Sequence, residues 1–110
     1  MEIEFLYFSG CPHHEPALQL LEKVMAEEGI ITPVKKIDVV SDSLAQEVRF
    51  AGSPSIRVNG QDIEPEGITE QGFVRKCRIY SVEGVPKGMP PEQPIHNALV
   101  AAKSKGSGCA

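Results

Sequence analysis

The pattern of apolar and polar residues at the start of the chain predicts a strand followed by a helix. Residues 3–8, Ile-Glu-Phe-Leu-Tyr-Phe, are nearly all apolar or aromatic, which is typical of a strand covered on both faces in a parallel or mixed sheet. Apolar residues then recur at helical spacing over residues 17–28, and Gly29 follows as a stop signal. Two prolines precede this segment, so either the first helical turn is distorted or the helix proper starts near Glu15.

The middle of the chain predicts a second strand, a short helix and a hairpin. The expected elements, in order, are a strand over residues 33–40, a helix over 43–50 capped by Ser41 or Asp42, a strand over 55–58, an Asn59-Gly60 turn and a returning strand at 62–63. A right-handed crossover makes the first two strands parallel, and the hairpin adds an antiparallel pair. The order βαβαββα therefore predicts an α/β fold with a small mixed sheet and helices on both faces.

The last third of the chain is less regular. Residues 64–76 are polar and poorly periodic, and the stretch "KCRIYSV" around Cys77 reads as a short extended segment. A loop is expected over residues 83–91 and a final helix over residues 92–103. The sequence thus predicts a single domain over residues 1–103 and a flexible Gly/Ser tail over residues 104–110.

Composition and charge exclude several classes of function. The chain of 110 residues has a net charge of −4, no tryptophan and no basic stripe, which argues against nucleic-acid binding. Its longest apolar run is far too short to span a membrane, and the acidic start "MEIEFLYF" is not a signal peptide. We therefore expect a cytoplasmic protein, in whose reducing compartment Cys11, Cys77 and Cys109 serve as thiols, metal ligands or catalytic groups.

The segment "SGCPHHEP" places a cysteine where a buried strand ends and a helix begins. Helix N–H groups and a nearby imidazolium stabilise a thiolate, so Cys11 is the expected nucleophile and His14 the expected proton donor or acceptor. The alternative is that Cys11 is a small core residue and His14 a solvated residue of the first helical turn. His13 points elsewhere on the helix and is expected to have no functional role, and His96, with no partner in the sequence pattern, is assigned to the surface.

The order of elements, the cysteine turn after the first strand and the "GSPSI" segment resemble the thioredoxin-like superfamily. This resemblance implies a three-layer sandwich with a Cys-x-x-Cys motif at the start of the first helix, where this chain has Cys11-Pro12-His13-His14. It also implies that the Ser53–Pro54 bond is cis and faces the cysteine. Pro12, Ser53 and Pro54 are then the expected substrate-binding residues.

The chain most closely resembles small bacterial thioredoxin-like proteins that are grouped with alkylmercury lyase. That lyase uses a cysteine, an aspartate three residues later and a second cysteine some sixty residues on. Here His14 stands in the aspartate's place, and Cys77 follows Cys11 at a comparable distance. The resemblance implies that Cys11 and Cys77 form a thiol pair for Hg(II) or another soft metal, with no other cofactor required.

Three functions are consistent with these residues. The first is disulfide exchange at Cys11 with a small thiol or disulfide, or with a protein thiol partner. The second is soft-metal handling by Cys11 and Cys77, with an organomercurial as substrate. The third is a non-enzymatic binding module that uses the groove beside Pro54, which the absence of a second cysteine in the motif favours. For Cys77, a buried core position is the alternative to a functional thiol.

Overall fold

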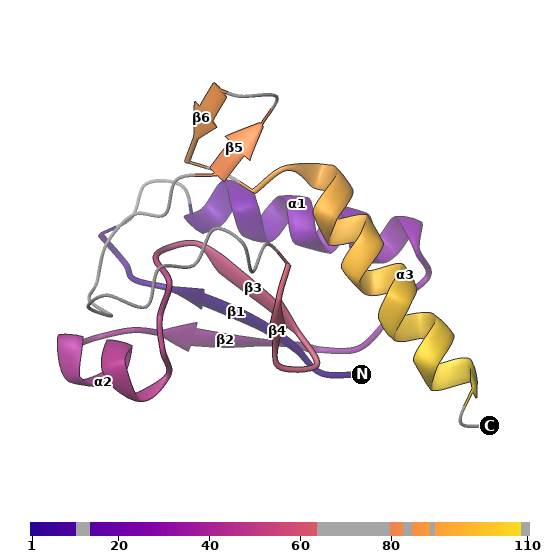
Figure 1. Cartoon of the computed structure of the whole chain (residues 1–110), viewed down its shortest axis with the longest axis horizontal. Coiled ribbons are helices and arrows are strands. Elements are labelled where there is room, and N and C mark those ends of the chain that lie inside the picture. Colours follow the sequence, from indigo (N-terminus) through magenta and orange to yellow (C-terminus); the bar gives the residue numbers. More distant parts are fainter. Residues whose placement is uncertain (11–13, 64–79, 83–84, 89, 109–110) are drawn as a thin grey trace.

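In a computed structural model of the chain, four strands form one mixed sheet (Figure 1). The structure describes residues 1–10, 14–63, 80–82, 85–88 and 90–108. The strands are β1 (Ile3–Tyr7), β2 (Val34–Asp38), β3 (Ser55–Val58) and β4 (Gln61–Asp62), arranged in the order β2-β1-β3-β4. β1 is parallel to β2 and antiparallel to β3, and β3 is antiparallel to β4. The expectation that the first strand lies inside a mixed sheet is thus confirmed.

Three helices complete this part of the fold, and local signals set most of their ends. They are α1 (His14–Glu27), α2 (Asp42–Glu47) and α3 (Glu92–Gly108). Gly29 follows α1 with a φ of 69°, a left-handed conformation that glycine adopts at low cost. Ser41 caps α2 by accepting a hydrogen bond from the Leu44 N–H at 3.1 Å. α2 ends earlier than the sequence predicts, because Arg49 takes a left-handed φ of 56°.

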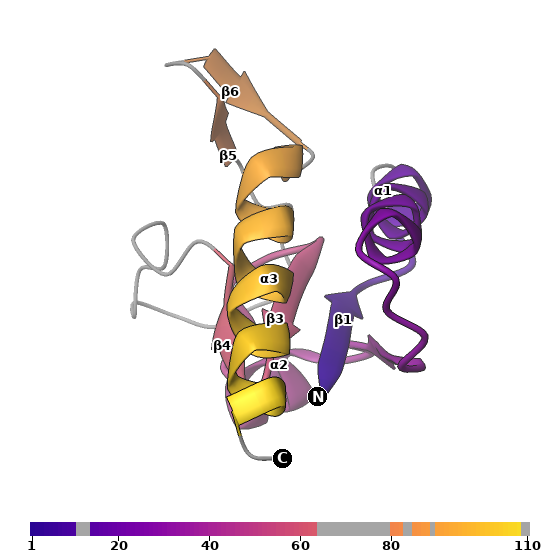
Figure 2. The ribbon, with the colours of Figure 1, turned by 90° about the vertical axis from the view of Figure 1, so that its right-hand side faces the viewer.

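The sheet has a different helix partner on each face. Ile3 and Phe5 of β1 are buried with residues of α1 and α3, whereas Leu6 is buried with Ala45 of α2 and with Phe50. This alternation follows from the strand period of two, which points successive side chains to opposite faces. α3 contacts both α1 and β3, and Figure 2 shows it in front of β3. β1 therefore has apolar residues on both faces, as its sequence predicts.

The hairpin is confirmed with a small change of boundary. Asn59 and Gly60 have φ values of 53° and 80°, the pair of positive angles that a type I′ turn requires. The returning strand begins at Gln61, one residue earlier than expected. The turn therefore has the two central residues that its Asn-Gly signal predicts.

Two features of the C-terminal third differ from the sequence prediction. The expected extended stretch corresponds to β5 (Tyr80–Val82), but β6 (Val85–Lys87) lies within the predicted loop and pairs with β5 in a separate two-stranded sheet. The loop prediction was wrong there because Glu-Gly between the strands is a weaker hairpin signal than Asn-Gly. α3 continues five residues beyond the predicted end at Lys103. Among the described residues, no helix is long and apolar enough to cross a membrane.

Candidate functional site

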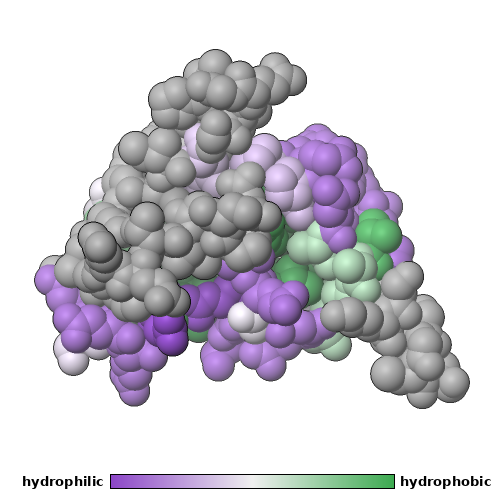
Figure 3. Space-filling model, viewed as in Figure 1, coloured by the Kyte–Doolittle hydropathy of each residue, from purple (hydrophilic) through white to green (hydrophobic). Residues whose placement is uncertain are grey.

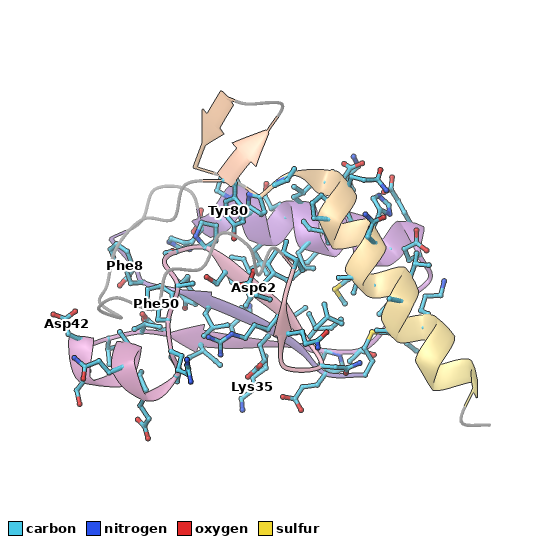
Figure 4. The ribbon with its side chains drawn as sticks, in the orientation of Figure 1. Phe8, Lys35, Asp42, Phe50, Asp62 and Tyr80 are labelled. Atoms are coloured by element: carbon cyan, nitrogen blue, oxygen red, sulfur yellow. The ribbon has the colours of Figure 1, made fainter. Side chains whose placement is uncertain are left out.

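The end of β1 and the start of β3 lie together at one end of the two central strands of the sheet. Leu6 is opposite Ser55 in the antiparallel register, and Phe8 and Phe50 lie at this end in Figure 4. A surface hollow of about 500 Å³ opens here, and its lining residues are Phe8, Ser9, Gly10, Val39, Val40 and Asp42. Gly10 is followed in the chain by Cys11, so the chain that leads to the predicted nucleophile forms part of the wall of this hollow.

The Ser53–Pro54 segment is held against the end of β1. The Ser53–Pro54 bond is cis, as the sequence analysis expects. The Phe8 N–H donates to the Ser53 hydroxyl at 3.4 Å, and both Ser53 and Pro54 are buried. The Tyr80 hydroxyl donates to the Pro54 carbonyl at 2.5 Å and is also buried (Figure 4). These contacts tie β5 and the segment before β3 to the strand that precedes Cys11.

His14 is the first residue of α1, and its ring stacks on Tyr7. The ring centroids are 4.9 Å apart and the planes are inclined by 23°. Tyr7 is the last residue of β1 and Phe8 follows it, so His14 and Ser53 contact consecutive residues of the same strand end. His14 and Ser53 therefore both lie at the end of β1, through their contacts with Tyr7 and Phe8.

Asp38 is a residue of this region that the sequence analysis missed. It ends β2 directly beside Tyr7 in the parallel register. Its Oδ1 atom is buried and has no hydrogen-bond partner among the residues that the structure describes. A buried carboxylate oxygen without a partner is costly and unusual, which is why such atoms recur at functional sites. The signal in the sequence is a single acid within the apolar run "IDVV", but no pattern indicates that one of its oxygens is buried.

The structure places some of the predicted site residues and leaves others outside its description. It brings His14, Ser53 and Pro54 to the end of β1 through the contacts given above. Cys11, Pro12 and Cys77 lie outside the described residues, as do His13 and Cys109. The pairing of Cys11 with Cys77, as a disulfide or as a two-thiolate metal site, therefore stays a prediction.

Away from this region, a cluster of charged residues joins the end of α1 to α3. Its contacts show that the assignment of His96 as a surface residue without a partner was wrong. The His96 Nδ1 atom is 3.0 Å from Glu28, and its Nε2 atom is 3.3 Å from Glu27 and 3.5 Å from Glu92. The hydrogen bond with Glu28 is the main cause that raises the pKa of His96, and the charges of the three carboxylates act in the same direction.

The same charges depress the pKa of the acids. Hydrogen bonds from His96 to Glu28 and from Lys23 to Glu92 are the main causes of the lowered pKa values of these two carboxyl groups. One ligand-type atom each from Glu27, Glu92 and His96 lies within 4.8 Å of the other two, which is a spacing that a metal ion can use. The ion pairs of His96 with the carboxylates and of Lys23 with Glu92 explain why these side chains lie close together without a metal ion.

Comparison of the chain with protein-family models, with curated proteins and with solved structures found no match.

Removing the Tyr80 hydroxyl is expected to destabilise the protein. Tyr80→Phe leaves the buried Pro54 carbonyl without its donor, which costs about 1–3 kcal/mol of the free energy of unfolding. Tyr7→Phe is the matched control, because the Tyr7 hydroxyl has no partner among the described residues and its ring is half-buried. Urea unfolding of both variants measures the difference. Equal losses for both would contradict a specific role of the Tyr80–Pro54 hydrogen bond.

Proposed function

We propose that this protein is a thioredoxin-like thiol protein in which Cys11 is the nucleophile. The observation that carries the proposal is the convergence of His14 and Ser53 on Tyr7 and Phe8, just before the chain reaches Cys11. The sheet order β2-β1-β3-β4 and the start of α1 three residues after Cys11 support it. A reducing, cytoplasmic compartment suits such a thiol.

In disulfide exchange, the Cys11 thiolate attacks one sulfur of a disulfide substrate. A new sulfur–sulfur bond forms, the substrate bond breaks, and the second sulfur leaves as a thiolate that takes a proton from His14. A second thiol from solution can then attack the substrate sulfur of the mixed disulfide and release Cys11 as a thiolate. Alternatively, Cys77 attacks the Cys11 sulfur, releases the substrate thiolate and forms a Cys11–Cys77 disulfide, which two thiols from solution reduce. The substrate class is a small disulfide or a protein thiol partner, with Pro12, Ser53 and Pro54 as the proposed contacts.

The second candidate is the handling of Hg(II) or an organomercurial by Cys11 and Cys77. Thiolates are the ligands that soft metal ions prefer, and two cysteines can hold such an ion between them. His14 would then supply a proton to the organic group that leaves the metal. The metal ion is the substrate in this function, and no resident cofactor is required.

Thiol reactivity tests the proposal at Cys11. In a Cys77→Ser/Cys109→Ser protein, the midpoint of the alkylation rate against pH should lie below the value of about 8.5 for a free cysteine. His14→Ala should raise this midpoint, because it removes the imidazolium that stabilises the thiolate. His96→Gln, on α3 beside the far end of α1, should leave the midpoint unchanged. A midpoint at or above the free value would rule out an activated thiolate and favour a binding module without thiol chemistry.

A further inference from the structure

Six charged residues form a line of contacts between the end of α1 and α3, which we call the ionic seam. It consists of Lys23, Glu27, Glu28, Glu92, His96 and Lys103. Lys23 is 3.0 Å from Glu92 at one end, and Lys103 is 3.5 Å from Glu28 at the other. Lys103 also donates to the Glu28 main-chain carbonyl at 2.7 Å, and so satisfies an acceptor at the C-terminal end of α1.

His96 occupies the centre of the seam and contacts all three carboxylates. Each of Glu28 and Glu92 contacts His96 with one carboxylate oxygen and a lysine with the other. The lysines therefore do not occupy the carboxylate oxygens that His96 contacts. The seam lies beside the apolar contact of the two helices, where Ile95 and Leu99 are fully buried. The surface over the beginning of α3 is hydrophilic in Figure 3, in agreement with this arrangement.

The ring proton of His96 decides the charge balance of the seam near neutral pH. Three carboxylates and two lysines give a sum of −1, and a protonated His96 brings it to zero. A neutral ring can donate to Glu28 through only one nitrogen, and its other nitrogen then presents a lone pair to Glu27 and Glu92. Among these groups, histidine is the one whose charge changes between pH 5 and 8.

We propose that the protonated ring of His96 stabilises the contact of α3 with the end of α1, and that deprotonation of the ring weakens this contact. We call this pH-dependent arrangement the clasp. The direction of the pH dependence follows from the directions of the pKa shifts. Because the folded state raises the pKa of His96 above 6.5, the clasp contributes fully below that pH and is lost as the pH rises through the folded pKa. The lowered pKa values of Glu28 and Glu92 set the other limit, since protonation of these acids below 4.5 also removes the attraction.

The groups that face His96 come from the two packed helices only, as far as the described residues extend. Glu27 and Glu28 approach from the end of α1, with Lys23 beyond them, and Glu92 and Lys103 belong to α3 itself. The residues that follow Glu28 in the connection to β2, 29–33, carry no charge. The clasp is therefore a property of the α1–α3 junction and does not depend on the proposed thiol chemistry.

The test is the pH dependence of unfolding in the reduced protein with a chelator present, so that metal ions play no part. The urea concentration at the unfolding midpoint of the parent should decrease as the pH is raised from 5.5 to 7.5. His96→Gln should remove most of this decrease. His14→Gln is the matched control and should keep it, because His14 contacts Tyr7 and not the seam. If His96→Gln keeps the full decrease, the proposal is overturned.

A titration of the histidine rings by NMR provides the second measurement. The pKa of His96, assigned by the loss of its signal in His96→Gln, should lie above 6.5, and Glu28→Gln should lower it. Glu47→Gln, on α2 at the other face of the sheet, should leave it unchanged. A His96 that titrates at or below 6.5 in the folded protein would overturn the clasp even if the stability of the variants differed.

Discussion

Replacing Leu21 with alanine is expected to lower the free energy of unfolding by about 2–5 kcal/mol. Leu21 lies in the middle of α1 and is fully buried in the core that α1 and α3 share with β1 and β3. The substitution removes buried apolar surface and leaves a cavity, because the rigid sheet and the second helix prevent full collapse. Urea or thermal unfolding followed by circular dichroism measures the loss.

Ile31→Ala is the control for the removal of an aliphatic side chain. Ile31 is 96% exposed, so its truncation should change the free energy of unfolding by less than about 0.5 kcal/mol. Similar losses for Leu21→Ala and Ile31→Ala would contradict the packing of α1 against the sheet and α3. The position of α1 also matters for function, since α1 carries His14 at its first residue.

Local signals predicted the first half of the fold because each one acts over a few residues. The apolar run of β1, the Ser41 cap and the Asn59-Gly60 turn each fix a structure through their own backbone or side-chain chemistry. β6 was missed because its strand signal is weak and because Glu-Gly, which connects it to β5 in the sequence, is a weaker hairpin signal than Asn-Gly. The hairpin of β3 and β4 was thus predicted correctly, because Asn59 and Gly60 readily adopt the positive φ angles that its turn requires.

Features that join distant parts of the chain could not be read from the sequence. His96 was assigned to the surface because Glu28 lies 68 residues away, and only the packing of α3 on α1 brings them together. Asp38 was missed because burial of a single carboxylate oxygen depends on how β2 lies beside β1. Ser53 was predicted through the resemblance, since its contact with Phe8 joins residues 45 positions apart in the sequence, whereas His14 was predicted from its place at the start of the first helix.

Loss of either Cys11 or Cys77 is expected to weaken Hg(II) binding at least about 100-fold, in a Cys109→Ser background. A two-thiolate site loses one of its two strong ligands in each single variant. The double variant Cys11→Ser/Cys77→Ser should be little worse than either single one, because the two thiols act as one site. Competition with a thiol chelator of known affinity measures the binding constants.

The same variants distinguish a shared site from two separate thiols. Independent and additive losses would mean two separate thiols and would leave Cys77 as a core residue. If both thiols are needed, His14→Ala separates binding from catalysis: release of the organic group from an organomercurial should slow while Hg(II) affinity persists. Unchanged release in this variant would remove His14 from the reaction. No release by the parent would leave a binding protein.

The sheet ends on one side at β2, which pairs with β1 and with no other described strand. An unpaired edge presents main-chain donors and acceptors that can recruit a strand from another molecule. β2 carries Lys35 and Lys36 at consecutive positions, which point to opposite faces of the sheet, and both are exposed (Figure 4 labels Lys35). If two copies met edge to edge in antiparallel fashion with Lys36 opposite Lys36, their charges would repel. In that register the lysines would disfavour edge-to-edge pairing of two copies, a consequence separate from folding and from chemistry.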